Sequence, residues 1–162
     1  MRVLGVDPGL AATGYGVVEY DAGRIRLIEG GVIRSNPDDL MENRVGSIFS
    51  GILEVLNEFQ PELVAMEDLY SHYKHPRTAI IMAHARGAVL VAAHQRGTPV
   101  RSYAATMIKM ALTGNGRARK EQVQRMVLAQ LGVKTPVEPY DTTDALAAAL
   151  CHLNQTMKVL VA

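Results

Sequence analysis

The heptapeptide VLGVDPG at residues 3–9 decides the fold. Its apolar start predicts a short buried strand, and the Pro-Gly pair after Asp7 predicts a turn that ends the strand. Two further strand-like segments follow at 13–20 and 24–34, and the Asp-Ala-Gly sequence at 21–23 between them is typical of a hairpin. The chain is therefore expected to open with three antiparallel strands, with Asp7 at the end of the first.

Downstream of this opening, helical and strand patterns alternate. An amphipathic helix is expected to begin at Pro37-Asp38-Asp39 and to stop at Gln60-Pro61, before a buried strand at 63–66 that ends at Glu67. The other expected elements are a nearly all-apolar helix at 79–93, a strand at 98–102, and helices at about 104–113, 119–131 and 141–157. This order predicts an α/β domain with a five-stranded mixed sheet, three antiparallel strands first and parallel ones after, flanked by helices on both faces.

Length and composition restrict the class of protein. The 162 residues predict a single domain, 1–162, and the 48% hydrophobic and 20% charged content is that of a globular chain. The lone Cys151 rules out an internal disulfide, which favours a cytoplasmic location. The net charge of +1 excludes a strongly basic coat but leaves room for a local basic patch that binds nucleic acid. No apolar run reaches the ~18 residues of a membrane span, so no membrane partner is expected.

Four acids stand where one fold would gather them. Asp7 and Glu67 end two strands, and Asp141 and Asp144 share one face at the start of the last helix. If those strands are parallel neighbours, the first two acids emerge side by side, and the last helix needs only to cross that edge. Clustered carboxylates repel one another unless a hard divalent cation such as Mg²⁺ neutralises them. A pair of such ions is typical of in-line phosphodiester hydrolysis.

Each acid also has an ordinary structural interpretation. Asp7 before Pro-Gly suits a turn, and Glu67 suits a solvated strand end. The segment from Asp141 to Asp144 suits a helix N-cap with its capping-box partner. The coincidence of three segments favours a shared site over three unrelated roles.

Two further segments predict contacts with nucleic acid. The sequence TGNGRARK at 113–120 places glycines and three cations before a helix, an arrangement that binds phosphate; an exposed basic loop is the alternative. Tyrosines alternate with cations in the loop at 70–77, which suits unpaired bases beside phosphates; a surface-packed loop is the alternative. The candidate DNA-binding residues are Tyr70, Lys74, Arg77, Lys109, Arg117, Arg119 and Lys120.

The histidines and the cysteine carry weaker signals. His72 and His75 have the spacing of zinc ligands, but no Cys or second His pair completes a site. His152 lies about three helical turns (~16 Å) beyond Asp141, too far to share its metal, so His152 and Cys151 are interpreted as packing residues.

Taken in order from about Val3 to about Leu153, these segments resemble the RuvC family of Holliday-junction resolvases. The resemblance rests on VLGVDPG with TGYG after it, QPELVAME ending at Glu67, the ARG of 85–87, the YAA of 103–105 with Lys109, GNGRARK ending at Lys120, and DTTDALA of 141–147. Each motif alone is weak evidence for the family, but the whole set in this order is specific to it.

The resemblance implies a ribonuclease-H-like fold and a homodimer that nicks two opposed strands of four-way junction DNA in recombination and repair, leaving 5′-phosphate and 3′-hydroxyl ends. It implies Asp7, Glu67, Asp141 and Asp144 as catalytic ligands of two Mg²⁺ ions per subunit, with Mn²⁺ as a substitute. It also implies Ruv A and Ruv B branch-migration proteins as partners. By matched position, Lys109 and Lys120 contact the scissile region and Tyr70 stacks on a junction base, although relatives often carry Phe there.

Three other classes compete with this interpretation. Actin-like ATPases share the opening strands but need two such domains, and 162 residues supply one. A non-catalytic junction-binding protein would lose the acids, and all four are present. A ribosomal-RNA-processing nuclease family shares the core, but the Asp141 and Asp144 pair, the basic segment and the length favour the resolvase. The apolar helix at 79–93 is a candidate for part of the dimer interface.

Overall fold

The computed structural model describes residues 1–69, 76–133 and 140–161, and within them five strands form one mixed sheet. The sheet order is β3-β2-β1-β4-β5. β1 pairs antiparallel with β2 and parallel with β4, β2 pairs antiparallel with β3, and β4 pairs parallel with β5. The expected mixed topology is confirmed. The strands are β1 (Arg2–Asp7), β2 (Ala12–Asp21), β3 (Arg24–Arg34), β4 (Leu63–Glu67) and β5 (Val100–Tyr103).

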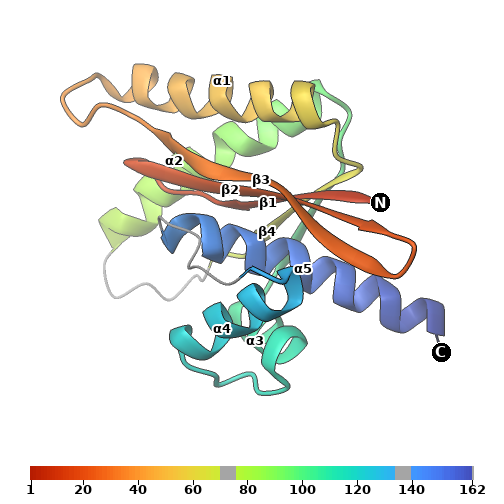
Figure 1. Cartoon of the computed structure of the whole chain (residues 1–162). Coiled ribbons are helices and arrows are strands. Elements are labelled where there is room, and N and C mark those ends of the chain that lie inside the picture. The colour runs from red at the N-terminus through yellow and green to blue at the C-terminus, as the bar shows by residue number, and fades with distance from the viewer. Residues whose placement is uncertain (70–75, 134–139, 162) are drawn as a thin grey trace.

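Helices cover both faces of the sheet, as expected (Figure 1). On one face lie α1 (Met41–Phe59) and α2 (Pro76–Gln95); on the other lie α3 (Ala105–Thr113), α4 (Lys120–Leu131) and α5 (Tyr140–Val161). Alternate strand residues feed the two cores: Leu4 packs on the α1 and α2 side, and Val3 packs on the α5 side. Among the described residues, no helix is both long and apolar enough to cross a membrane.

The start of α1 corrects one expectation. The helix begins at Met41, not at Pro37. The side chain of Asn36 instead accepts a hydrogen bond from the Asp38 amide at 3.1 Å and donates one to the Asp39 carboxylate at 3.2 Å. Asx side chains compete with helical hydrogen bonding in this way, so the two aspartates belong to a turn before the helix.

The first turns of α5 lie directly on the main chain of the sheet. A side-chain carbon at Gly5 of β1 would overlap the carbonyl group of Ala145, and one at Gly14 of β2 would overlap the carbonyl group of Asp141. The Thr142 hydroxyl also donates a hydrogen bond to the Gly31 carbonyl at 3.1 Å. Glycine thus permits a close approach that any other residue would block, and this approach sets the position of the acids on α5.

Candidate active site

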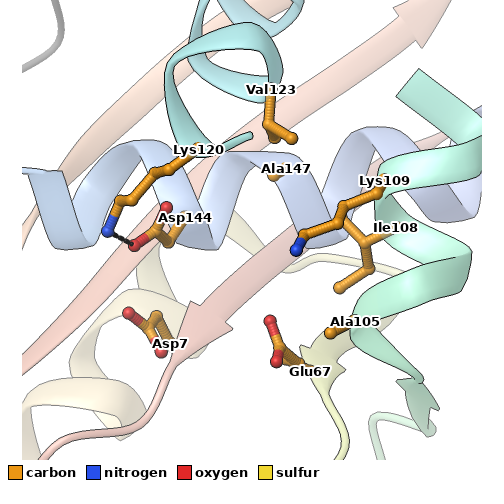
Figure 2. Close-up of a pocket in the computed structure, with 9 residues that line it drawn as sticks. All are labelled: Asp7, Glu67, Ala105, Ile108, Lys109, Lys120, Val123, Asp144 and Ala147. Carbon is orange, nitrogen blue, oxygen red and sulfur yellow. Dashed lines mark hydrogen bonds and ion pairs between the residues drawn. The ribbon is translucent and has the colours of Figure 1, made fainter. Parts of the chain in front are cut away.

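Asp7 and Glu67 lie at the same edge of the sheet. Because β1 and β4 pair in parallel, with Val6 opposite Met66, the next residue of each strand ends at that edge. Figure 2 shows both carboxylates pointing into one pocket. The expected juxtaposition of the two strand ends is confirmed.

The helix α5 adds its acids from above this edge. Asp144 lines the same pocket, a cleft of about 270 Å³ (Figure 2). Asp141 lies about one helical turn earlier on α5. Asp141 does not line the cleft, but its charge is close enough to raise the pKa of Asp7. The structure therefore brings together Asp7, Glu67 and Asp144 around the cleft, with Asp141 at its margin.

The acids disfavour one another's ionisation. Burial, followed by the charges of Asp144, Asp141 and Glu67, raises the pKa of Asp7 to about 7. Partial burial and the charge of Asp144 also raise the pKa of Glu67, whose side chain keeps contact with solvent. The cluster thus favours a proton, or a cation in its place, at Asp7.

Two lysines supply positive charge to the cleft. The ammonium of Lys120, the first residue of α4, donates a hydrogen bond of 2.6 Å to the Asp144 carboxylate, and this bond raises the pKa of Lys120 (Figure 2). Lys109 reaches in from α3, and its charge lowers the pKa of Glu67. The apolar wall between the lysines consists of Ala105, Ile108, Val123 and Ala147.

The donor atoms at this edge fit a hard divalent cation in their chemistry. They are carboxylate oxygens whose mutual repulsion such a cation would relieve. In the described part of the chain, however, no three acidic, His or Cys side chains stand close enough to hold one ion as they are placed. At Asp144 the counter-charge is the Lys120 ammonium. The arrangement is an acidic pocket lined by carboxylates from three elements, with a lysine as counter-charge at Asp144.

The other predicted DNA-binding residues lie outside the cleft. Arg117 and Arg119 are exposed between α3 and α4; the Asn115 side chain accepts a hydrogen bond from the Arg117 amide at 2.9 Å, and the Gln122 side chain accepts one from the Arg119 amide at 2.8 Å. Arg77 is exposed at the start of α2. The predictions for Tyr70, Lys74, His72 and His75 fall on residues outside the described ranges.

His152 and Cys151 are placed in the core side of α5. Cys151 is buried, as expected of a packing residue. His152 does more than pack, because its Nδ1 shares a hydrogen bond of 2.5 Å with the Tyr103 hydroxyl. The polar contact was not foreseen, since it joins two residues 49 positions apart.

Sequence reasoning missed two features that shape the site. The close approach of α5 to the sheet depends on Gly5. A glycine inside an otherwise apolar strand is the sequence feature that could have indicated this approach. Arg86 of α2 binds the main chain of Glu67 from the opposite face of the sheet. The sequence feature that could have pointed to Arg86 is that it is the one charged residue in the segment 79–93, which is otherwise apolar except for His84.

Comparisons with known proteins agree with this geometry. The family model described as "Crossover junction endodeoxyribonuclease RuvC" matches residues 3–152. A protein of that description from Rhodopirellula baltica is 46% identical over 149 residues, covering 92% of this chain and 84% of the relative.

Two solved structures are also similar over almost the whole chain. The Thermus thermophilus RuvC structure has a TM-score of 0.90 at 41% identity and covers 98% of this chain and 97% of its own. T. thermophilus RuvC in complex with Holliday junction substrate has a TM-score of 0.89 at 38% identity and covers 98% and 96%. The likeness confirms the expected ribonuclease-H-like fold.

Proposed function

The chain belongs to the RuvC family of crossover junction endodeoxyribonucleases, and from this premise we propose that its acidic cleft resolves four-way DNA junctions by paired hydrolysis of two opposed strands in recombination and repair. The observation that supports the assignment of the cleft is the convergence of Asp7, Glu67 and Asp144 from three separate segments. We propose one nuclease domain over residues 1–162 and a cytoplasmic site of action.

The four acids are the proposed ligands of two Mg²⁺ ions per subunit, or of Mn²⁺ in their place. When bound, such ions supply an activated water and charge neutralisation at the leaving 3′ oxygen, which gives 5′-phosphate and 3′-hydroxyl ends. Asp7 of β1 is the acid of this set whose pKa the other three all raise. Glu67 and Asp144 flank it across the cleft.

The cationic wall of the cleft is the proposed site for the scissile strand. Lys109 and Lys120 stand beside the acids and hold positive charge where a phosphate would lie. Arg117 and Arg119 extend this charge along the loop before α4. Tyr70, Lys74 and Arg77 remain proposed contacts to junction bases and phosphates.

We also propose a homodimer, with α2 at its interface. A four-way junction has near two-fold symmetry, and a two-fold dimer offers it two identical sites. On α2, the exposed fractions of Ile80 and Val91 are 60% and 58%, which is high for apolar residues in a helix. An apolar groove of about 530 Å³ between α1 and α2 adjoins Val91. Ruv A and Ruv B branch-migration proteins are the proposed partners.

A cleavage assay on synthetic DNA tests the proposed function. With Mg²⁺, the protein should nick a four-way junction symmetrically and leave a linear duplex of the same sequence uncut; without divalent ions, it should bind the junction and cut neither substrate. Equal cleavage of duplex and junction would contradict the substrate assignment. Cleavage at full rate in EDTA would contradict the metal assignment.

Val91→Glu tests the dimer. A buried, unpaired carboxylate in the interface should convert the dimer into a monomer at micromolar concentration and suppress coordinated cutting of opposed strands. Light scattering gives the mass, and a junction in a supercoiled plasmid distinguishes paired from single nicks. Gln95→Glu, which adds the same charge at an exposed polar position of α2, is the control and should remain dimeric. A dimeric Val91→Glu protein would place the interface elsewhere.

A further inference from the structure

Arg86 lies behind the acidic cleft and binds the end of the strand that carries Glu67. Its guanidinium donates hydrogen bonds to the Glu67 carbonyl oxygen at 2.8 Å and to the Ser102 hydroxyl at 2.5 Å. It also lies 3.6 Å from the Asp68 carboxylate. Only 14% of the Arg86 side chain is exposed, so α2 holds this cation against the sheet rather than in solvent.

These contacts of Arg86 hold the main chain of β4 at the point where its pairing with β5 ends. The parallel register of β4 and β5 ends with Glu67 opposite Tyr103, and one hydrogen bond of 2.8 Å from the Asp68 amide to the Tyr103 carbonyl follows it. Beyond that point, the Arg86 fork connects the ends of both strands to α2. The carbonyl of Glu67 is held on the α2 side while its carboxylate lines the cleft under α5.

The contact between Arg86 and Glu67 fixes the position of the Glu67 main chain and does not pair the two side-chain charges. Arg86 binds the carbonyl of Glu67 and not its carboxylate, and the pKa of Glu67 is governed by burial, Asp144, Lys109 and Lys120. Arg86 also lines a second, small cavity of about 80 Å³ together with Asp7 and Glu67, which places it next to two of the acids without entering the cleft itself. An arginine fork fixes direction as well as distance, which a single-point donor does not.

We propose that Arg86 is a positioning residue for the reaction: it sets the backbone at Glu67 so that the Glu67 carboxylate points into the cleft that Asp7 also lines. This inference rests on the proposed function, in which those two acids are metal ligands. Residues that hold a ligand in place typically contribute 10–100-fold to metal affinity. Since Arg86 lies on α2, the same contact joins the proposed dimer helix to the metal site.

The experiment compares Mn²⁺ binding, measured by electron paramagnetic resonance without DNA, in the wild type, Arg86→Met and Arg86→Lys. Arg86→Met should bind Mn²⁺ about 10-fold more weakly and need a correspondingly higher Mg²⁺ concentration for half-maximal junction cleavage. Junction binding in EDTA should stay within about two-fold of wild type. Arg86→Lys keeps one donor and should fall between the two. Arg96→Met, at an exposed arginine just after α2, should match the wild type.

The outcomes separate this inference from the proposed function. Wild-type Mn²⁺ affinity in Arg86→Met would overturn the positioning role while leaving the nuclease assignment intact. A wild type that takes up no Mn²⁺ and cuts no junction would overturn the proposed function itself. If Arg86→Met does not fold, Arg86→Lys combined with Ser102→Ala replaces it, because that pair removes the fork and keeps the charge. Wild-type affinity in that double variant would equally overturn the role.

Discussion

Asp7→Asn is expected to reduce junction cleavage by about 10³-fold or more while junction binding stays intact or becomes tighter. The amide keeps the size of the side chain but cannot serve as an anionic ligand, and Asp7 is the acid on which the charges of Asp144, Asp141 and Glu67 converge. Removal of a negative charge near the DNA phosphates also lowers repulsion. Cleavage is measured by single-turnover kinetics in Mg²⁺ and binding by gel shift in EDTA. A variant that cuts at the wild-type rate would remove Asp7 from the metal site.

The stability of the same variant is its control. A carboxyl group whose pKa is about 7 in the folded protein and 3.8 in its unperturbed state favours unfolding at pH 8, because its charged form is more stable in the unfolded chain. This penalty disappears as the pH falls below the unfolded value. In EDTA at pH 8, Asp7→Asn should therefore melt at the same temperature as the wild type or higher. A lower melting temperature would attribute the lost cleavage to misfolding.

The acidic site was predictable because it depends on sequence patterns of short range. Asp7 and Glu67 each follow an apolar strand, and the carboxyl ends of neighbouring parallel strands share an edge. Asp141 and Asp144 share a helix face by spacing alone. The Lys120 contact to Asp144 was harder to predict from the sequence, because it joins residues 24 positions apart and depends on how α4 packs against α5.

Other details were decided by contacts that no local pattern shows. The aspartates before α1 suit a helix start by charge, but the Asn36 side chain holds them in a turn. The role of Arg86 depends on which face of the sheet α2 covers, and the apolar pattern of that helix does not specify a face. Sequence patterns therefore predicted the helices, the strands and the positions of the acids. The side chains that hold the acids in place are determined by tertiary packing and could not be predicted in this way.

Gly5→Ala is expected to disrupt both the fold and the site, although Gly5 bears no functional group. An added methyl would overlap the Ala145 carbonyl and crowd Ala149, both on α5, and main-chain atoms in a buried helix cannot turn aside. The helix must move away from β1, at a cost of about 3 kcal/mol or more in the free energy of unfolding. Its movement displaces Asp141 and Asp144, and a shift of about 1 Å is enough to lower cleavage by about 10²-fold. Urea unfolding and junction cleavage measure the two effects.

Gly46→Ala is the matched control, because a side-chain carbon at this helical position of α1 meets no atom within 4 Å. It should stabilise the fold by about 0.5–1 kcal/mol, as alanine does in place of a helical glycine. Because Gly46 lines the groove beside the proposed dimer interface, it is the control for urea unfolding and not for cleavage. The comparison separates a general loss of backbone freedom from a specific clash under α5. If Gly5→Ala unfolds at the wild-type urea concentration and cuts junctions normally, α5 does not rest on β1 at Gly5. Asp141 and Asp144 would then owe their position to other contacts, such as the Thr142 hydrogen bond to Gly31 or the packing of Asp141 on Gly14.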